Sequence, residues 1–570
     1  MKCRMFPLAV ILCATIFAAI ILLMPLMQWQ DAQFPFRGVV IMPTDAELHY
    51  AARMREIYDG FWTGNTFFSE PKDQPYLQPP LPEMIPAMVS KFLHLNPVST
   101  FVVFSVLCAF LLVVTMVGTI AVLTDTTWES LIAVCILVFS GFLLGAPWDF
   151  WEFLTGSGTF EPLRFTRPIN PLWTVPWFFA AIWLTAEWLR GRRIALAYCV
   201  VPLTILVYSY VYAWSYLAVT LGLLTIYLAC TGDWRKVRDL SICGAFVGVF
   251  SIPYIFHLFE TIRHPLYEES SQRIGIIASR SPIFGVWMIL GVLTIVIARK
   301  RWGVTWQLAA ALIIGGIMAM NQQILSGRYL VPHHYHWYFF QPLASMLAMV
   351  LVLRILGRYL SDRLTPFIIG LLICVAIAFG IRYQTLAYMN VRDYWGAQQA
   401  LAPVLEYVDK NMHAGQVVYS PNIGIMDFVP VYTSADVYNS SNAINYLVST
   451  DRARAVFFFD LWVHGYTVDQ AKKEFPTTLR SKLGSALSAI YFREKYGSYD
   501  AIPDDLVLKN VDAYKKYISM SDSEKIRLYP IDAVILPDNV QQTHAIALLK
   551  SMSDEVFVSE GFSVRMMKIQ

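Results

Sequence analysis

The sequence predicts a polytopic α-helical membrane protein with about eleven transmembrane helices, followed by a soluble α/β domain. Three observations lead to this fold class. Hydrophobic residues make up 56% of the 570 residues and charged residues only 15%, whereas soluble domains carry about 25% charged residues. The apolar residues gather in runs of about 20, the length of a helix that crosses a bilayer. From residue 386 onward these runs stop, and short strand and helix patterns alternate.

The first apolar segment is interpreted as an uncleaved transmembrane helix. Its apolar run is longer than the roughly 7–15 residues of a signal peptide, and no A-x-A cleavage site follows it. Ten further segments have the length and composition of spans, although the fifth and sixth share one apolar run that "YSYVYAWS" interrupts as a tight turn or a kink. The predicted spans are 6–28, 99–123, 129–146, 172–189, 194–209, 212–230, 239–258, 282–298, 304–320, 336–353 and 364–381.

The positions of the basic residues predict the orientation of these spans. With the N-terminus in the cytoplasm, the basic strings "EWLRGRR", "DWRKVR", "ARKRW" and "LRILGRYLSDR" all fall in cytoplasmic loops, as the positive-inside rule requires. The longer loops, 29–98, 147–171, 259–281 and 321–335, then face outward together with the chain after about residue 385. We therefore expect an integral plasma (inner) membrane protein whose working surface and C-terminal domain are extracytoplasmic.

Residues 386–570 are predicted to form an extracytoplasmic α/β domain after a transmembrane domain at 1–385. The strings "GQVVYSP", "RAVFFFDLW", "IDAVILPD" and "EVFVSEGFSVRMMKI" have strand character, while "APVLEYVDKNM" and "THAIALLKSM" have helical character. G-x-G-x-x-G and P-loop motifs are absent from the sequence, so no nucleotide site is predicted.

Charge and cysteine content exclude further classes of protein. The net charge is +3 and the C-terminal part contains no basic run, so we expect no nucleic-acid partner. The eight cysteines lie in or beside apolar segments without C-x-x-C spacing, which predicts neither a disulfide framework nor a cysteine metal site.

The stretch "MPTDAELHYAARMREIYDG" in the first outer loop is rich in polar side chains. Thr44-x-x-Glu47 has the pattern of a capping box, and Asp59-Gly60 marks the end of a helix of about four turns. The helix is amphipathic, which predicts that it rests on the membrane surface. Asp45 and Glu47 have two open interpretations: acids that stabilise a helix start, or acids that act in catalysis.

An acidic pair just after the first span, followed by "HYAARMREIYDG", resembles the first outer loop of the GT-C superfamily of membrane glycosyltransferases. Asp45 and Glu47 match the acidic pair of that superfamily. The predicted layout is also similar: many spans, a surface helix after the first span and a C-terminal α/β domain. The resemblance implies an enzyme that takes its sugar from a polyprenyl-phosphate-linked donor.

The resemblance also implies a chemistry. An acceptor hydroxyl loses its proton as it attacks the anomeric carbon, and Asp45 would serve as the general base. Glu47 is the alternative base, or it orients the acceptor or a divalent ion. The lipid phosphate leaves with developing negative charge, which cations or a metal must stabilise. No cofactor is required, although Asp45 and Glu47 are the candidate ligands for a divalent cation (Mg or Mn). A single displacement would invert the sugar.

The outer loops supply the other candidate site residues. Arginine suits phosphate, and the string "VPHHYHW" favours polar contacts to sugar or phosphate over zinc, because two or three histidines without an acid do not complete a zinc site. The alternatives are an interfacial belt of aromatic residues and arginine for the second and fourth loops, and a lid or a solvated connection for the third. The candidate substrate-binding residues are His49, Asp149, Glu152, Arg164, Arg167, Arg263, Arg328, His333, His334 and His336.

The leading hypothesis is thus a glycosyltransferase with a glycan, lipid or protein acceptor on the outer or lumenal face of the bilayer. A transporter or flippase is the first alternative, but the spans contain few ionisable residues and no internal repeat. A polysaccharide polymerase or ligase for lipid-linked glycans is the second alternative. A scaffold with an outer sensor domain is the third.

Overall fold

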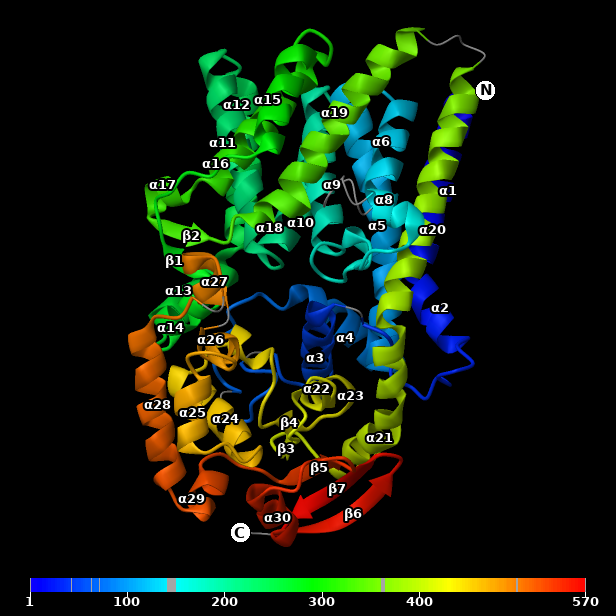
Figure 1. The fold of residues 1–570 in the computed structure, drawn as a ribbon. Helices are drawn as coiled ribbons and strands as arrows, with labels where there is room; N and C mark the ends of the chain where they lie inside the picture. The colour runs from blue at the N-terminus through cyan, green and yellow to red at the C-terminus, as the bar shows by residue number, and fades with distance from the viewer. Residues whose placement is uncertain are drawn as a thin grey trace.

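The structure, a computed structural model, describes residues 2–42, 44–62, 64–70, 72–140, 150–359, 364–488, 490–498 and 501–568. A bundle of long apolar helices forms one end of the molecule, and a mixed α/β region forms the other (Figure 1). The bundle helices are α1 (Lys2–Ile21), α2 (Leu23–Trp29), α5 (Pro97–Thr124), α6 (Trp128–Phe139), α9 (Thr174–Leu189), α10 (Ile194–Val207), α11 (Val211–Cys230), α12 (Trp234–Phe250), α13 (Ile252–Arg263), α15 (Val286–Ala298), α16 (Trp306–Met320), α19 (Gln341–Leu356) and α20 (Thr365–Ala397).

Every predicted span contains a helix, but not every helix is long enough to cross a bilayer. Among the described residues, five helices have the length and composition of a span, and seven do if the bent pairs α1–α2 and α12–α13 each count as one. The other four predicted spans correspond to α6, α9, α10 and α15, which have 12 to 16 residues. Such helices rise only ~18–24 Å, less than the bilayer core of about 30 Å. The fold is therefore polytopic and helical with five to seven clear spans.

The predicted outer loops all lie at the end of the bundle that faces the α/β region, while the N-terminus lies at the opposite end (Figure 1). The break in the fifth and sixth spans is a tight turn, since α10 ends at Val207 and α11 begins at Val211. The outer-loop elements are α3 (Asp45–Asp59), α4 (Leu81–Leu93), α8 (Phe150–Thr155), α14 (Tyr267–Arg273), β1 (Ile276–Ala278), α17 (Gln323–Ser326), β2 (Arg328–Leu330), α18 (His333–Tyr335) and a π-helix (His336–Phe340).

The C-terminal region contains a five-stranded mixed sheet in the order β4-β3-β5-β7-β6. The first three strands are parallel, and β7 pairs antiparallel with both β5 and β6. The strands are β3 (Val417–Tyr419), β4 (Asp436–Val437), β5 (Ala533–Pro537), β6 (Ser553–Ser559) and β7 (Phe562–Met567). The helices are α21 (Ala402–Asn411), α22 (Ile423–Met426), α23 (Val429–Tyr432), α24 (Thr450–Val463), α25 (Val468–Glu474), α26 (Arg480–Ser488), α27 (Ile490–Tyr496), α28 (Asp504–Ser519), α29 (Asp522–Arg527) and α30 (His544–Ser551).

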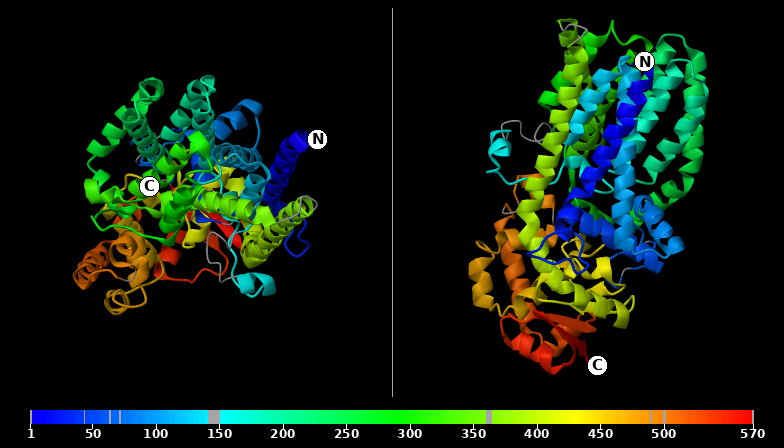
Figure 2. Two further views of the ribbon diagram at one scale, coloured as in Figure 1. Left: turned by 90° about the horizontal axis from the view of Figure 1, so that it is seen from above. Right: turned by 90° about the vertical axis from the view of Figure 1, so that its right-hand side faces the viewer.

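One predicted strand is wrong. The string "RAVFFFDLW" lies in the helix α24, whose start is capped by the Ser449 hydroxyl, which accepts a hydrogen bond from the Arg452 backbone N–H at 3.1 Å. Its apolar residues are buried on every side of the helix. A fully buried helix and a buried strand both appear in a sequence as a continuous apolar run, so hydrophobic periodicity does not distinguish them. The domain boundary at residue 386 stays a prediction, since α20 runs across it as one continuous helix (Figure 2).

The helix α3 has the predicted bounds but a different environment. It begins after Thr44 and ends at Gly60, whose φ of 115° is left-handed, as in a glycine C-cap. The Thr44 side chain makes no capping hydrogen bond, so the predicted capping box is wrong. Residues 47–54 are buried without exception, because α3 lies between the bundle and the C-terminal region rather than on an open membrane surface.

The first outer loop and the C-terminal region share one hydrophobic core. Ala52 and Met54 of α3 belong to the same buried cluster as Val418 and Val534 of the sheet. The loop also extends the sheet, because the Val437 N–H donates to the Phe67 carbonyl at 2.8 Å beside the edge strand β4. The loop is therefore an integral part of the C-terminal layer.

A buried ion pair fixes α3 to α4. Arg53 Nη1 lies 2.9 Å from Glu83 Oε1, and the two side chains are only 6% and 0% exposed. Arg53 Nη2 also donates to the Gln78 carbonyl at 2.8 Å. If one member of such a pair is removed, the other charge stays in the protein interior without a partner, and the interior solvates it poorly.

We therefore expect Arg53→Met to destabilise the protein by about 3–5 kcal/mol. The double variant Arg53→Met/Glu83→Met should recover most of this loss, because both charges are then absent from the interior. Thermal unfolding of the purified full-length protein in detergent measures both effects. A double variant no more stable than the single one would show that the ion pair is not the origin of the loss.

Candidate active site

Glu47 is the charged residue in the lining of a mostly apolar cavity. The cavity has a volume of about 510 Å³, including space open to solvent, and is lined by side chains of α1, α2, α5 and α20 and of the loop before α9, including Ile21, Phe101 and Pro168. Glu47 itself is 6% exposed. Ser105, Thr166 and Gln384 are the other polar residues of the lining. An apolar cavity with a carboxylate in its wall suits a ligand with an apolar part and a polar head.

Arg167 lies among aromatic hydroxyl groups and within electrostatic range of Glu47. Its Nη1 donates to the Tyr338 hydroxyl at 2.9 Å, while its Nε is buried without a hydrogen-bond partner. Burial lowers the pKa of Arg167, but the nearby Tyr338, Tyr50, Tyr210 and Glu47 raise it, and the net pKa lies above the ordinary value. The guanidinium is thus a fixed positive charge with an N–H group left to donate.

The neighbouring residues hold these hydroxyl groups in place. Asn170 Nδ2 donates to the Tyr50 hydroxyl at 3.0 Å, which connects the second outer loop to α3. The Tyr210 hydroxyl, just before α11, makes a hydrogen bond to His334 Nδ1. Side chains from α3, the second outer loop, the start of α11 and the fourth outer loop therefore meet around Arg167.

Arg164 forms the second positive group of the site. Its Nη1 donates to Gln341 Oε1 at 3.2 Å, and its guanidinium lies 5.9 Å from the centre of the Trp337 ring. Burial lowers the pKa of Arg164, although tyrosines and Glu161 nearby oppose this. His336 lies within electrostatic range of Arg164. The second and fourth outer loops therefore approach one another here.

The other predicted site residues lie elsewhere or outside the described residues. Asp149 and the side chain of Asp45 are not among the described residues; the Asp45 backbone opens α3. Glu152 is exposed on α8, and Arg263 is exposed at the end of α13. Arg328 is exposed and pairs with Glu268 at 3.2 Å. His333 Nε2 lies 3.9 Å from Glu494 Oε1 of the C-terminal region. The roles predicted for all of these residues stay predictions.

No group of three or more His, Cys, Asp or Glu side chains lies together within the described part of the chain. The side chain of Asp45, one of the two predicted ligands for a divalent cation, is outside the described residues. The Mg or Mn site at Asp45 and Glu47 therefore stays a prediction.

Sequence reasoning missed the aromatic and amide groups around Arg167. The sequence analysis does not single out Tyr50, Tyr210, Tyr338 or Asn170 as site residues. The interruption "YSYVYAWS" was the available signal, because three tyrosines and two serines in an apolar run are costly in a bilayer unless they have partners.

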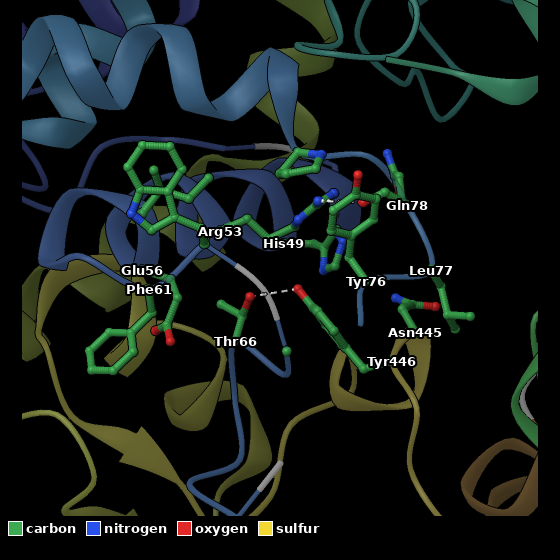
Figure 3. Close-up of a pocket in the computed structure, with 14 residues that line it drawn as sticks. His49, Arg53, Glu56, Phe61, Thr66, Tyr76, Leu77, Gln78, Asn445 and Tyr446 are labelled. Atoms are coloured by element: carbon green, nitrogen blue, oxygen red, sulfur yellow. Dashed lines mark hydrogen bonds between the residues drawn. The ribbon is translucent and has the colours of Figure 1, made fainter. Parts of the chain in front are cut away.

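A second cavity lies on another face of α3. It has a volume of about 410 Å³, including space open to solvent, and lies between α3, residues 61–62, 64–66 and 76–80, and the loop at Asn445 and Tyr446; His49, Arg53 and Glu56 point toward it from the helix (Figure 3). These three residues follow one another at i, i+4 and i+7, the spacing of a single helix face. Glu47 lies about 200° around the helix from His49, which places the two cavities on different sides of α3.

Glu56 belongs to a buried charge cluster beside this second cavity. Lys72 Nζ lies 2.7 Å from Glu56 Oε1 and 2.5 Å from Asp436 Oδ1 of β4. One positive charge therefore faces two carboxylates. Burial raises the pKa of Glu56 to about 7, although Lys72 opposes the shift, so this carboxyl group takes up a proton near neutral pH.

The helices and the buried polar site define an integral membrane protein of polytopic helical fold with a mixed-sheet C-terminal region. No known protein-family profile and no curated protein matches the chain. ArnT from Cupriavidus metallidurans in the apo state is similar at 11% identity, with 95% of this chain and 96% of that chain covered and a TM-score of 0.45.

Two further solved structures are similar over most of the chain. The Archaeoglobus fulgidus oligosaccharyltransferase tethered with an acceptor peptide shares 12% identity, with 85% of this chain and 71% of that chain covered and a TM-score of 0.46. ArnT bound to undecaprenyl phosphate shares 11% identity, with 90% and 92% covered and a TM-score of 0.43. Likenesses of this size assign no function to the chain.

The raised pKa of Glu56 predicts a pH-dependent stability. The pKa is about 7 in the folded state against the ordinary value of 4.5, so the folded protein binds more protons than the unfolded chain between these pH values. Stability therefore falls as pH rises from 4.5 to 7 and changes no further above that. Between pH 4.5 and 7 the free energy of unfolding should therefore decrease less in Glu56→Gln than in the wild type, by up to about 3 kcal/mol.

Thermal unfolding at pH 5, 6, 7 and 8 tests this expectation. Glu560→Gln, which changes a side chain that is 73% exposed, is the matched control and should follow the pH profile of the wild type. Parallel profiles for Glu56→Gln and the wild type would contradict the raised pKa.

Proposed function

We propose that the chain is a membrane glycosyltransferase that moves a sugar from a polyprenyl-phosphate-linked donor to an acceptor hydroxyl. The observation that supports this most is a mostly apolar cavity whose lining includes Glu47, Thr166 and Pro168, because the partly buried cation Arg167 lies between the last two residues in the sequence and within electrostatic range of Glu47. An isoprenoid chain requires an apolar cavity and its phosphate requires cations.

The arginines suit the leaving group. When the glycosidic bond breaks, negative charge develops on the lipid phosphate, and fixed donors placed at that charge lower the barrier. Arg167 has an unpartnered buried N–H, and Arg164 supplies a second guanidinium. Arginine keeps its charge when buried and binds phosphate oxygens through two N–H groups at once.

The proposed base is Asp45, which opens α3 two residues before Glu47. The first turn of a helix stabilises a carboxylate, which would accept the proton of the acceptor hydroxyl. Glu47 then acts as a positioning residue, because it lies within electrostatic range of Arg167 and attracts the guanidinium. Attack opposite the phosphate in a single displacement inverts the anomeric centre.

Transport is the less favoured alternative. An apolar cavity with a volume of about 1140 Å³, including space open to solvent, lies between α10, α11, α12 and α13, and none of its lining residues is Asp, Glu, Lys, Arg or His. Ion-coupled carriers place ionisable side chains along their substrate path. A polymerase or ligase for lipid-linked glycans would share the proposed donor site, and identification of the reaction product distinguishes them.

The proposed location is the plasma (inner) membrane with the N-terminus in the cytoplasm and the site outside. The basic loops between α9 and α10, between α11 and α12 and after α15 support this orientation through the positive-inside rule. The acceptor is a glycan, a lipid or a protein that reaches the outer face.

Arg167→Gln should lower sugar transfer by about 100-fold or more, because a preorganised donor to the leaving group is lost. Mass spectrometry of cell-surface glycans, together with the amount of lipid-linked sugar that accumulates, measures the effect in cells that lack the wild-type protein. Arg37→Gln is the matched control, since Arg37 forms an exposed pair with Glu560 at 2.7 Å and should transfer at the wild-type rate. An Arg167→Gln protein that folds normally and restores the glycan profile would refute the phosphate role.

Asp45→Asn tests the base separately. The change keeps the size and the hydrogen-bonding shape of the side chain but removes its basicity, so we expect transfer to fall by about 10²–10⁴-fold while the donor still binds. Glu47→Gln should lose less, because it perturbs Arg167 only indirectly. Equal transfer by Asp45→Asn and wild-type protein would refute Asp45 as the base.

A further inference from the structure

The second cavity on α3 contains buried polar groups that the proposed donor site does not use. His49 Nδ1 and Gln78 Nε2 are buried without a hydrogen-bond partner, and both residues line the cavity. His49 is only 7% exposed. Buried polar groups in folded proteins nearly always have partners, so unpartnered groups that line one cavity indicate that a ligand supplies them.

Aromatic rings form much of the remaining wall. Phe61, Trp62, Tyr76 and Tyr446 line the cavity together with the amide side chain of Asn445 (Figure 3). The Tyr446 ring is held in position, because its hydroxyl donates to Thr66 Oγ1 at 2.7 Å. Flat aromatic faces beside amide and hydroxyl groups suit a ligand that is apolar on one face and rich in hydroxyl groups at its edge.

The charged side chains that line the cavity already have ionic partners. Arg53 is paired with Glu83, and Glu56 shares Lys72 with Asp436. Burial and the charges of Arg53 and Arg167 lower the pKa of His49 to about 3, so its imidazole is neutral. The groups left to bind a ligand, His49 and Gln78, are therefore uncharged, which favours a neutral ligand.

His49 connects this cavity to the proposed donor site. It lines the cavity and lies within electrostatic range of Arg167, whose own environment includes Glu47. A ligand in the cavity is thus adjacent to the end of α3 where transfer is proposed to occur.

We infer that this cavity binds a neutral sugar ring of the acceptor, so that the transferred sugar is added to a saccharide. The inference rests on the proposed function. The aromatic walls stack against the ring, while His49, Gln78 and Asn445 bind its hydroxyl groups. A hydrocarbon chain would leave these amide and imidazole groups without partners.

Quenching of the Trp62 fluorescence tests the inference without requiring transfer. The full-length protein in nanodiscs is titrated with the methyl glycosides of glucose, galactose, mannose, N-acetylglucosamine, xylose and arabinose, and with a neutral Asn-x-Thr hexapeptide. We expect saturable quenching by at least one glycoside. Trp62→Phe should abolish the signal, which assigns it to this cavity.

Two variants and a control locate the binding site. Gln78→Ala and Asn445→Ala should each weaken glycoside binding about tenfold, because each loses one hydrogen bond to the sugar. Gln541→Ala, an exposed amide of the distant C-terminal region, should bind as the wild type does. Using two variants keeps the test valid if one of them fails to fold.

Three results would overturn the inference: no saturable quenching by any glycoside, saturation by the peptide alone, or glycoside binding that both folded cavity variants leave unchanged. The outcome is separable from that of the proposed function, since Arg167→Gln should still bind the glycoside. Absence of glycoside binding together with loss of transfer in Arg167→Gln overturns only the acceptor assignment. Glycoside binding together with normal transfer by Arg167→Gln overturns the phosphate role instead.

Discussion

The burial of α3 is the constraint on which the rest of the site depends. A helix that carries Glu47, His49, Arg53 and Glu56 is enclosed between the membrane bundle and the C-terminal region, and each enclosed charge requires a partner. Arg53 obtains it from Glu83 on α4 and Glu56 from Lys72. These pairs fix the rotation of α3 about its axis, and that rotation decides which side chains face each cavity.

With its rotation fixed, α3 separates two environments of different chemistry. On one side lies an apolar cavity whose lining includes Glu47, within electrostatic range of the Arg167 guanidinium. On the other, aromatic rings and amide side chains line a second cavity together with His49, Arg53 and Glu56. Under the proposed function, this division lets a membrane lipid and a sugar reach the reacting atoms from different sides of the helix.

Local signals in the sequence account for much of the fold. The apolar runs predicted a helix at every span, and Asp59-Gly60 predicted the end of α3. What could not be predicted depends on long-range contacts. "RAVFFFDLW" is a helix because neighbours from α26, α28 and α30 bury it all round, and the hydroxyl groups around Arg167 come from Tyr50 and from Tyr338, 288 residues later. Arg164 and Arg167 were predicted as substrate-binding residues because arginine suits phosphate. The residue types of Tyr338 and Asn170 give no comparable indication of a binding role.

The hydrogen bond from Val437 to Phe67 has a consequence for biosynthesis. The ribosome makes the segment around Phe67 early, but its partner strand only about 370 residues later, which at cellular elongation rates is on the order of tens of seconds. During that interval α3 has no C-terminal layer to cover its polar face. The nascent chain must therefore keep this loop from aggregating until its partner strand has been made, which makes the maturation of this protein dependent on how quickly the last third of the chain is delivered.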